Sequence, residues 1–83
     1  MDRAEMMFLA ACEDGRVSAV PRCCHAVAWA GLAVRHIEYR ERERLGNALL
    51  ARGYLAPGER IQGNAHAMLL TETGRAVLAA APA

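Results

Sequence analysis

Two stretches of the chain, LGNALLARGYL (Leu45–Leu55) and MLLTETGRAVL (Met68–Leu78), decide the fold that the sequence predicts. The first is typical of a helix that ends at a glycine, because Gly53 suits the left-handed conformation common at helix C-termini. The second passes from an apolar run into Thr71, a residue type that caps helix N-termini. A segment rich in turn-forming residues lies between them. We therefore expect a helix, a short strand, a polar loop, a second short strand and a helix.

The N-terminal residues predict another helix. Asp2 and Glu5 match a capping box, and Gly15 provides a left-handed end. This helix would place four residues on one face: Met7, Phe8, Ala11 and Cys12. Arg16 and Val17 follow as a one- or two-residue strand, which would pair with the later hairpin.

Two more helices are expected in the middle of the chain. One would begin at the N-cap Ser18, tolerate Pro21 in its first turn and run to Trp29, a core residue. Gly31 marks the break after it. The next would begin between Leu32 and Arg35 and end at Arg52. Its inner face would hold Leu45, Ala48 and Leu49, with Tyr39, Arg40, Glu43, Gly46, Asn47 and Leu50 roughly opposite.

The C-terminal part predicts a small hairpin and a last helix. Tyr54–Ala56 and Ala67–Leu70 would be its strands, with turns at Pro57–Gly58 and Gly63–Asn64. The last helix would run from Glu72 to about Ala81. The absence of a linker or repeat indicates one domain over residues 1–83, mostly α with a small β-hairpin.

The C-terminal half resembles the wing end of MarR- and PadR-like winged-helix regulators. The resemblance rests on Arg52-Gly53-Tyr54-Leu55 and on the run from Leu70 to Leu78, and it covers about two-fifths of the chain. It implies a winged helix-turn-helix fold, α-(β)-α-α-β-β-α, and binding of double-stranded DNA in transcriptional control. One departure is that the Asp-x-Arg pair frequent in MarR-like wings is replaced by adjacent Glu59 and Arg60.

Two segments are candidates for DNA contact. In a helix-turn-helix the second helix enters the major groove, which here is the helix over residues 35–52. Its candidate residues are Arg35, His36, Tyr39, Arg40 and Glu43 toward bases, and Arg42 and Asn47 toward phosphates or neighbouring bases. The wing, residues 57–66, offers Arg60, Gln62, Asn64 and His66 to phosphates or the minor groove.

The charge pattern leaves a protein partner open as the alternative. The net charge is only +1: residues 1–34 carry three Arg and four acids, and residues 35–83 carry seven Arg and five acids. Glu38–Arg42, Arg35–Glu38 and Glu41–Arg44 match the spacing of ion pairs on a solvated helix. The same fold would then serve as a protein–protein interaction module, for example a phage or mobile-element accessory protein.

The remaining patterns argue against catalysis and against a cofactor. Cys12, Cys23 and Cys24 are an odd number with two adjacent, which does not suggest a disulfide framework. Cys23-Cys24-His25 also lacks the spacing of a zinc site, so we expect no metal. No nucleophile elbow, phosphate-binding glycine loop or HExxH run is present, and we expect no enzyme activity.

Location and assembly can be predicted more coarsely. The longest apolar run, Ala26–Val34, is too short to span a bilayer, and no secretory leader is evident, so we expect a cytoplasmic protein. A core of this size rarely supplies more than about 3–5 kcal/mol of net stability. We therefore expect a homodimer that pairs through the alanine-rich outer helices.

Overall fold

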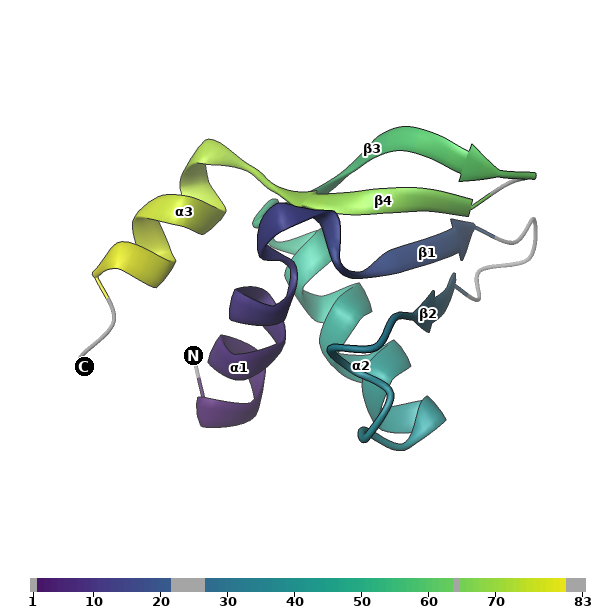
Figure 1. Cartoon of the computed structure of the whole chain (residues 1–83). Helices are drawn as coiled ribbons and strands as arrows, with labels where there is room; N and C mark the ends of the chain where they lie inside the picture. The colour runs from purple at the N-terminus through teal and green to yellow at the C-terminus, as the bar shows by residue number, and fades with distance from the viewer. Residues whose placement is uncertain (1, 22–26, 64, 81–83) are drawn as a thin grey trace.

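Helices alternate with pairs of strands along the chain in the computed structural model, which describes residues 2–21, 27–63 and 65–80. The order is α1 (Arg3–Ala11), the 3₁₀ turn η1 (Glu13–Gly15), β1 (Ser18–Pro21), β2 (Val27–Ala30), α2 (Tyr39–Ala51), β3 (Leu55–Gln62), β4 (Ala65–Leu70) and α3 (Glu72–Ala79). The strands form one antiparallel sheet in the order β2-β1-β4-β3. The described residues thus form a small α+β domain (Figure 1).

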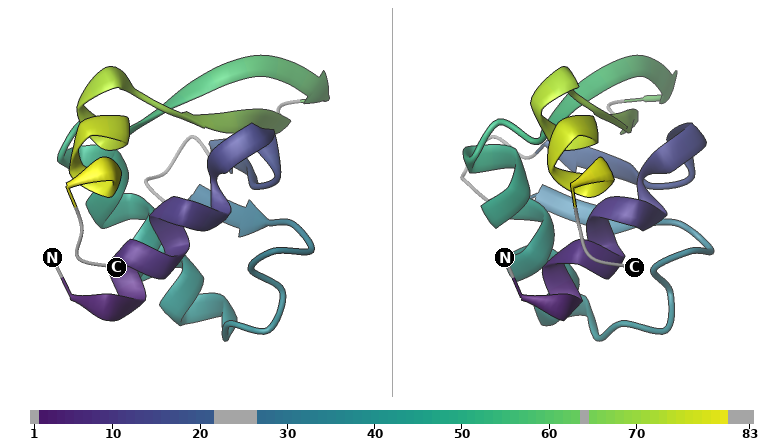
Figure 2. Two further views of the ribbon diagram at one scale, coloured as in Figure 1. Left: turned by 60° about the vertical axis from the view of Figure 1, so that its left-hand side comes forward. Right: turned by 90° about the vertical axis from the view of Figure 1, so that its left-hand side faces the viewer.

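The core lies between the sheet and two helices. Both α1 and α2 lie on the same side of the sheet, and α3 lies beyond one end of it (Figures 1 and 2). Phe8 of α1 meets Trp29 of β2 edge to face, with ring centroids 5.6 Å apart. The buried apolar residues are Phe8, Leu9, Cys12, Val17, Ala19, Trp29, Val34, Leu45, Leu49, Leu55 and Met68. These contacts confirm the core positions expected for Trp29, Leu45 and Leu49.

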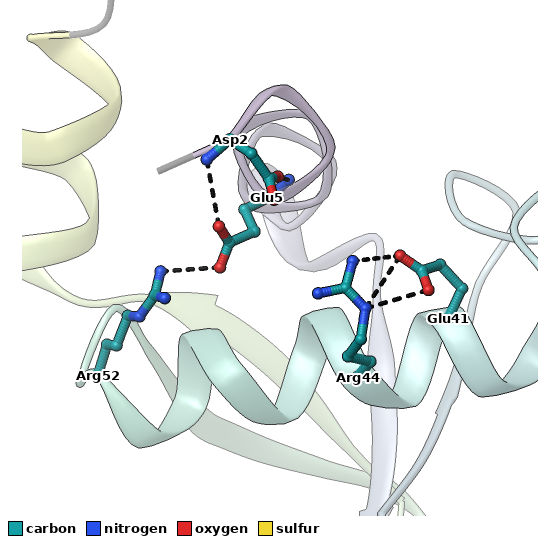
Figure 3. Close-up of polar contacts among 5 residues, drawn as sticks. All are labelled: Asp2, Glu5, Glu41, Arg44 and Arg52. Atoms are coloured by element: carbon teal, nitrogen blue, oxygen red, sulfur yellow. Dashed lines mark hydrogen bonds and ion pairs between the residues drawn. The ribbon is translucent and has the colours of Figure 1, made fainter.

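The capping box at the start of α1 is confirmed. The Glu5 amide donates to Asp2 over 2.8 Å, and the Asp2 amide donates to the Glu5 carboxylate. The same buried carboxylate accepts from Arg52 at the end of α2 over 2.8 Å, which ties the two helices together (Figure 3). Met7 is the wrong member of the expected apolar face, because its side chain is 56% exposed and Leu9 is buried instead.

The second helix expected over Ser18–Trp29 is wrong wherever that segment is described. Ser18–Pro21 and Val27–Ala30 are paired strands, with Ala19 opposite Trp29. β1 also pairs with β4, and the Val17 oxygen accepts from the Met68 amide over 2.9 Å. The pairing expected for Arg16 and Val17 is therefore present, but the strand itself lies at Ser18–Pro21. Satisfying main-chain groups of two neighbouring strands outweighs the local capping signal of Ser18. Residues 22–26, including Cys23 and Cys24, lie outside the described part.

The β3–β4 hairpin is confirmed but is longer than expected. Pro57 and Gly58 do not form a turn: Pro57 lies opposite Met68 inside the ladder. One extra residue enters β3 between Pro57 and Arg60, and another between Arg60 and Gln62, so two β-bulges bend this strand. Proline is tolerated because β3 is an edge strand. Gly63, with φ of +58°, is at the expected second turn, whereas Asn64 lies outside the described residues.

The two stretches that decide the fold meet in space. Gly53 has φ of +79°, and the amides of Gly53 and Tyr54 donate back to the oxygens of Leu50 and Leu49, which closes α2 as expected. The Thr71 hydroxyl accepts from the Gly74 amide over 3.0 Å, which confirms the cap of α3, and donates to the Gly53 oxygen over 2.6 Å. The end of α2 and the start of α3 are therefore joined directly.

Candidate functional site

The N-terminal part of the expected DNA-reading helix is not helical. Arg35 and His36 lie in a turn that precedes α2, where the Ile37 amide donates to the Val34 oxygen over 3.0 Å. Val34 is fully buried and anchors this turn, so the chain reaches α2 only at Tyr39. Both Arg35 and His36 are exposed. The helix was expected to begin between residues 32 and 35, but it spans Tyr39–Ala51. The side chains of Arg35 and His36 nevertheless remain accessible to solvent.

The side chain of Arg42 makes contacts within the fold. Its Nη1 donates to the main-chain oxygen of Trp29 over 3.0 Å, and its guanidinium carbon lies 5.5 Å from the centroid of the Tyr39 ring. Its Nε is buried and makes no hydrogen bond within the described structure. The Arg42 side chain is thus held against the edge strand β2, and its assignment to phosphates or bases stays a prediction.

Asn47 and Gly46 also face the sheet, although the helical pattern placed them opposite the core. The Asn47 Oδ1 accepts from the Trp29 Nε1 over 3.0 Å. A Cβ at Gly46 would come within 2.3 Å of the indole Cε2 of Trp29. Gly46 lies three residues before buried Leu49 and therefore shares the inward face of α2, where the indole of Trp29 contacts both Gly46 and Asn47. Asn47 is thus a hydrogen-bond acceptor for the buried indole, and its contact with bases or phosphates stays a prediction.

Other residues of α2 remain accessible. Tyr39 and Arg40 are exposed, and Glu43 is half-buried. Arg40 makes no ion pair among the described residues. Arg44, one turn after Arg40, is exposed and pairs with Glu41 (Figure 3). The hydrogen bonds from Arg44 hold the pKa of the Glu41 carboxyl below its usual value. Arg44 was missed as a candidate, although its spacing of four from Arg40 places both on one stripe.

The hairpin supplies one accessible cation from the candidate set. Arg60 is exposed on β3, between exposed Glu59 and Ile61. His66 lies opposite Arg60 on β4 and is half-buried, with its Nδ1 3.1 Å from the Gly58 oxygen. This contact leaves His66 less available to DNA than expected. Of Gln62 only the main chain is described.

The candidate residues do not form one continuous patch. The N-terminal end of α2 packs beside β2, whereas Arg60 lies on β3 at the other edge of the sheet. Strands β1 and β4 separate the two edges (Figure 1). The accessible arginines thus form two groups: Arg35, Arg40 and Arg44 around the start of α2, and Arg60 on the hairpin.

The residues that the structure describes contain neither a metal-binding cluster nor a membrane-spanning helix. No group of three or more His, Cys, Asp or Glu side chains in that part of the chain is arranged to hold a metal ion. Cys12 is buried, which raises the pKa of its thiol to about 12. Cys23, Cys24 and His25 lie outside it. None of the helices described there combines the length and apolar character that crossing a membrane requires.

Comparisons of this chain with protein families, with curated proteins and with solved structures find no match. We therefore infer the function from the positions and chemistry of the side chains.

Proposed function

We propose that this chain is a small DNA-binding protein built on a variant of the winged helix. The support is topological: α1, β1, α2 and the β3–β4 hairpin follow in the winged-helix order, with β1 paired to β4. The variant lies in the segment before α2, where β2 stands in place of the first helix of a helix-turn-helix. Transcriptional control is the role that such a protein would serve.

The observation that carries the proposal is the set of accessible arginines on α2, on the turn before it and on the hairpin. Arg35, Arg40 and Arg60 are exposed and make no ion pair within the described residues. Arginine binds phosphates in a bidentate manner and reads guanine in the major groove. In this arrangement α2 presents Arg40 and Arg44 to the duplex, and Arg60 contacts a neighbouring phosphate.

The test is duplex binding measured by fluorescence anisotropy at several salt concentrations. Each phosphate contact that is lost reduces the slope of log K against log salt by about 1. Arg40→Ala and Arg60→Ala should each reduce the slope by about this amount. Arg3→Ala, which removes an exposed arginine from α1, is the matched control and should leave the slope unchanged. Absence of salt-dependent binding to any duplex would reject the proposal.

A protein partner is the second candidate, because large apolar side chains are exposed on the same two surfaces. Leu32, in the turn before α2, is 81% exposed, and Ile61, beside Arg60, is 61% exposed. A protein partner that covered either surface would remove one of these side chains from water, which is favourable. Under this alternative, Leu32→Ser and Ile61→Ser would abolish partner binding, and duplex affinity would be absent in the unmodified chain.

A further inference from the structure

The strand β3 carries a large apolar residue that the fold does not cover. Ile61 is 61% exposed and lies one residue before the end of β3, next to the turn at Gly63. Among the described residues, it belongs neither to the apolar core nor to the partly buried side chains packed around that core. The C-terminal end of β3 lies at the opposite end of the hairpin from α3 (Figure 1). Ile61 is therefore accessible at the turn end of the hairpin.

Ile61 is also the extra residue of the second β-bulge in β3. Arg60 pairs with His66 and Gln62 pairs with Ala65, so Ile61 has no partner on β4. Bulges change the direction in which a side chain points, and they occur frequently beside functional sites. The bulge therefore makes Ile61 a candidate for contact with a ligand.

The first β-bulge of β3, between Pro57 and Arg60, is explained by contacts within the fold. A Cβ at Gly58 would lie 2.6 Å from Cδ1 of Leu69, so the main chain leaves room there for this leucine. The Gly58 oxygen also lies 3.1 Å from Nδ1 of His66. The second bulge instead holds a side chain that is mostly in water. Packing thus accounts for the first bulge and not for the second.

The residue next to Ile61 has the chemistry of a DNA contact. Arg60 is exposed and makes no ion pair within the described residues. The negative potential of a narrow minor groove attracts arginine. Proteins that bind this groove frequently insert an apolar side chain, such as isoleucine, between two base pairs. Arg60 and Ile61 supply both groups at consecutive positions of one strand.

We propose that Ile61 inserts between two base pairs from the minor groove and kinks the duplex, while Arg60 contacts the adjacent backbone. This inference, which rests on the proposed DNA binding, adds bending of the duplex as an activity. Insertion unstacks one base step, which is easiest at pyrimidine–purine steps such as TA. Contacts that a bent duplex gains repay the unstacking. The two groups of accessible arginines, at opposite edges of the sheet, are available for such contacts.

The experiment measures bending and binding on the same duplex. The duplex has one central TA step and carries donor and acceptor dyes at its ends, so that energy transfer rises when it bends. The unmodified chain should raise the energy transfer, since insertion kinks DNA by about 20–90°. The rise should be smaller on the same duplex with AT in place of TA, because that step is stiffer.

Variants at residue 61 test the role of the side chain. Ile61→Ser should abolish the rise in energy transfer and leave the salt slope of binding unchanged, because Arg60 remains. Ile61→Leu keeps an apolar side chain that can insert, and it should bend the duplex nearly as much as the unmodified chain does. Met7→Ser is the matched control: it removes a side chain that is 56% exposed on α1, and it should change neither bending nor binding.

Three results would overturn the proposal: binding without a rise in energy transfer, equal bending of the TA and AT duplexes, or a rise that Ile61→Ser leaves intact. Each of them leaves the proposed DNA binding standing, whereas absence of binding to any duplex overturns both. Circular dichroism shows whether each variant is folded. The comparison of the TA and AT duplexes uses the unmodified chain alone and does not depend on any variant.

Discussion

The hydroxyl of Thr71 donates a hydrogen bond of 2.6 Å to the main-chain oxygen of Gly53, and it accepts another from the Gly74 amide. The Thr71 side chain therefore contacts the residue that follows α2 and also caps the N-terminus of α3. The Thr71 amide also donates to the Tyr54 oxygen over 3.1 Å. The end of α2 at Gly53 and the run Leu70–Gly74 therefore occur together in the sequence because they contact each other in the fold.

Thr71→Ala should lower the free energy of unfolding by about 1–2 kcal/mol, because it removes an N-cap and a tertiary hydrogen bond together. Urea denaturation followed by circular dichroism measures the loss. Thr73→Ala removes an exposed hydroxyl in the first turn of the same helix and should change stability little. Equal effects of the two substitutions would contradict the role of Thr71.

Gly46→Ala should destabilise the fold even though alanine is the better helix former by about 1 kcal/mol. The added Cβ would lie 2.3 Å from the indole of Trp29, which is buried and cannot move aside freely. Overpacking of this kind typically costs about 1–3 kcal/mol. Thermal unfolding decides the sign: a Gly46→Ala chain more stable than the unmodified chain would disprove the close packing of Trp29 on α2.

Arg42 and Arg40 should respond in opposite ways to truncation. Arg42→Ala removes the donor to the Trp29 oxygen and should cost about 1–2 kcal/mol of stability, with little change in the salt dependence of duplex binding. Arg40→Ala should leave stability nearly unchanged and reduce the salt slope. Urea denaturation and anisotropy on both variants test this separation. If Arg42→Ala left stability unchanged but reduced the slope, the structural assignment of Arg42 would be wrong.

The buried thiol of Cys12 should make the fold sensitive to alkali. Burial raises its pKa from the ordinary value of 9.0 to about 12, so the unfolded chain loses this proton at lower pH than the folded chain does. The contribution to stability is complete below pH 9 and is lost as pH rises from about 9 toward 12, by at most about 1.4 kcal/mol per pH unit. The difference in unfolding free energy between the unmodified chain and Cys12→Ala isolates this group. A difference that stays constant across this range would contradict it.

Helix ends could be predicted from the sequence, because their capping residues lie within a few positions of one another along the chain. The capping pair Asp2 and Glu5, the glycine at residue 53 and the cap at Thr71 are each readable within a few positions, and the structure confirms all three. Periodicity also identified Leu45 and Leu49 as core residues.

The errors arose where contacts distant in the sequence decide the outcome. Nothing local to Ser18–Pro21 reveals that β4 is available as a strand partner, and the capping signal of Ser18 therefore predicted a helix. The partners of Arg42 and Asn47 could not be predicted for the same reason, because both side chains bond to Trp29, which lies on β2 and is distant in the sequence. Among the candidate DNA contacts, the sequence could identify exposed arginines by type but not separate Arg40 from Arg42.

Amide NMR spectra of the chain titrated with a duplex test the central claim most directly. We predict that signals of residues 35–44 and 59–63 shift as duplex is added at low salt, and that they return as salt is raised. Signals from α1 and α3 should stay in place. Shifts confined to α1 or α3, or spectra that the duplex leaves unchanged, would contradict DNA binding through α2 and the hairpin.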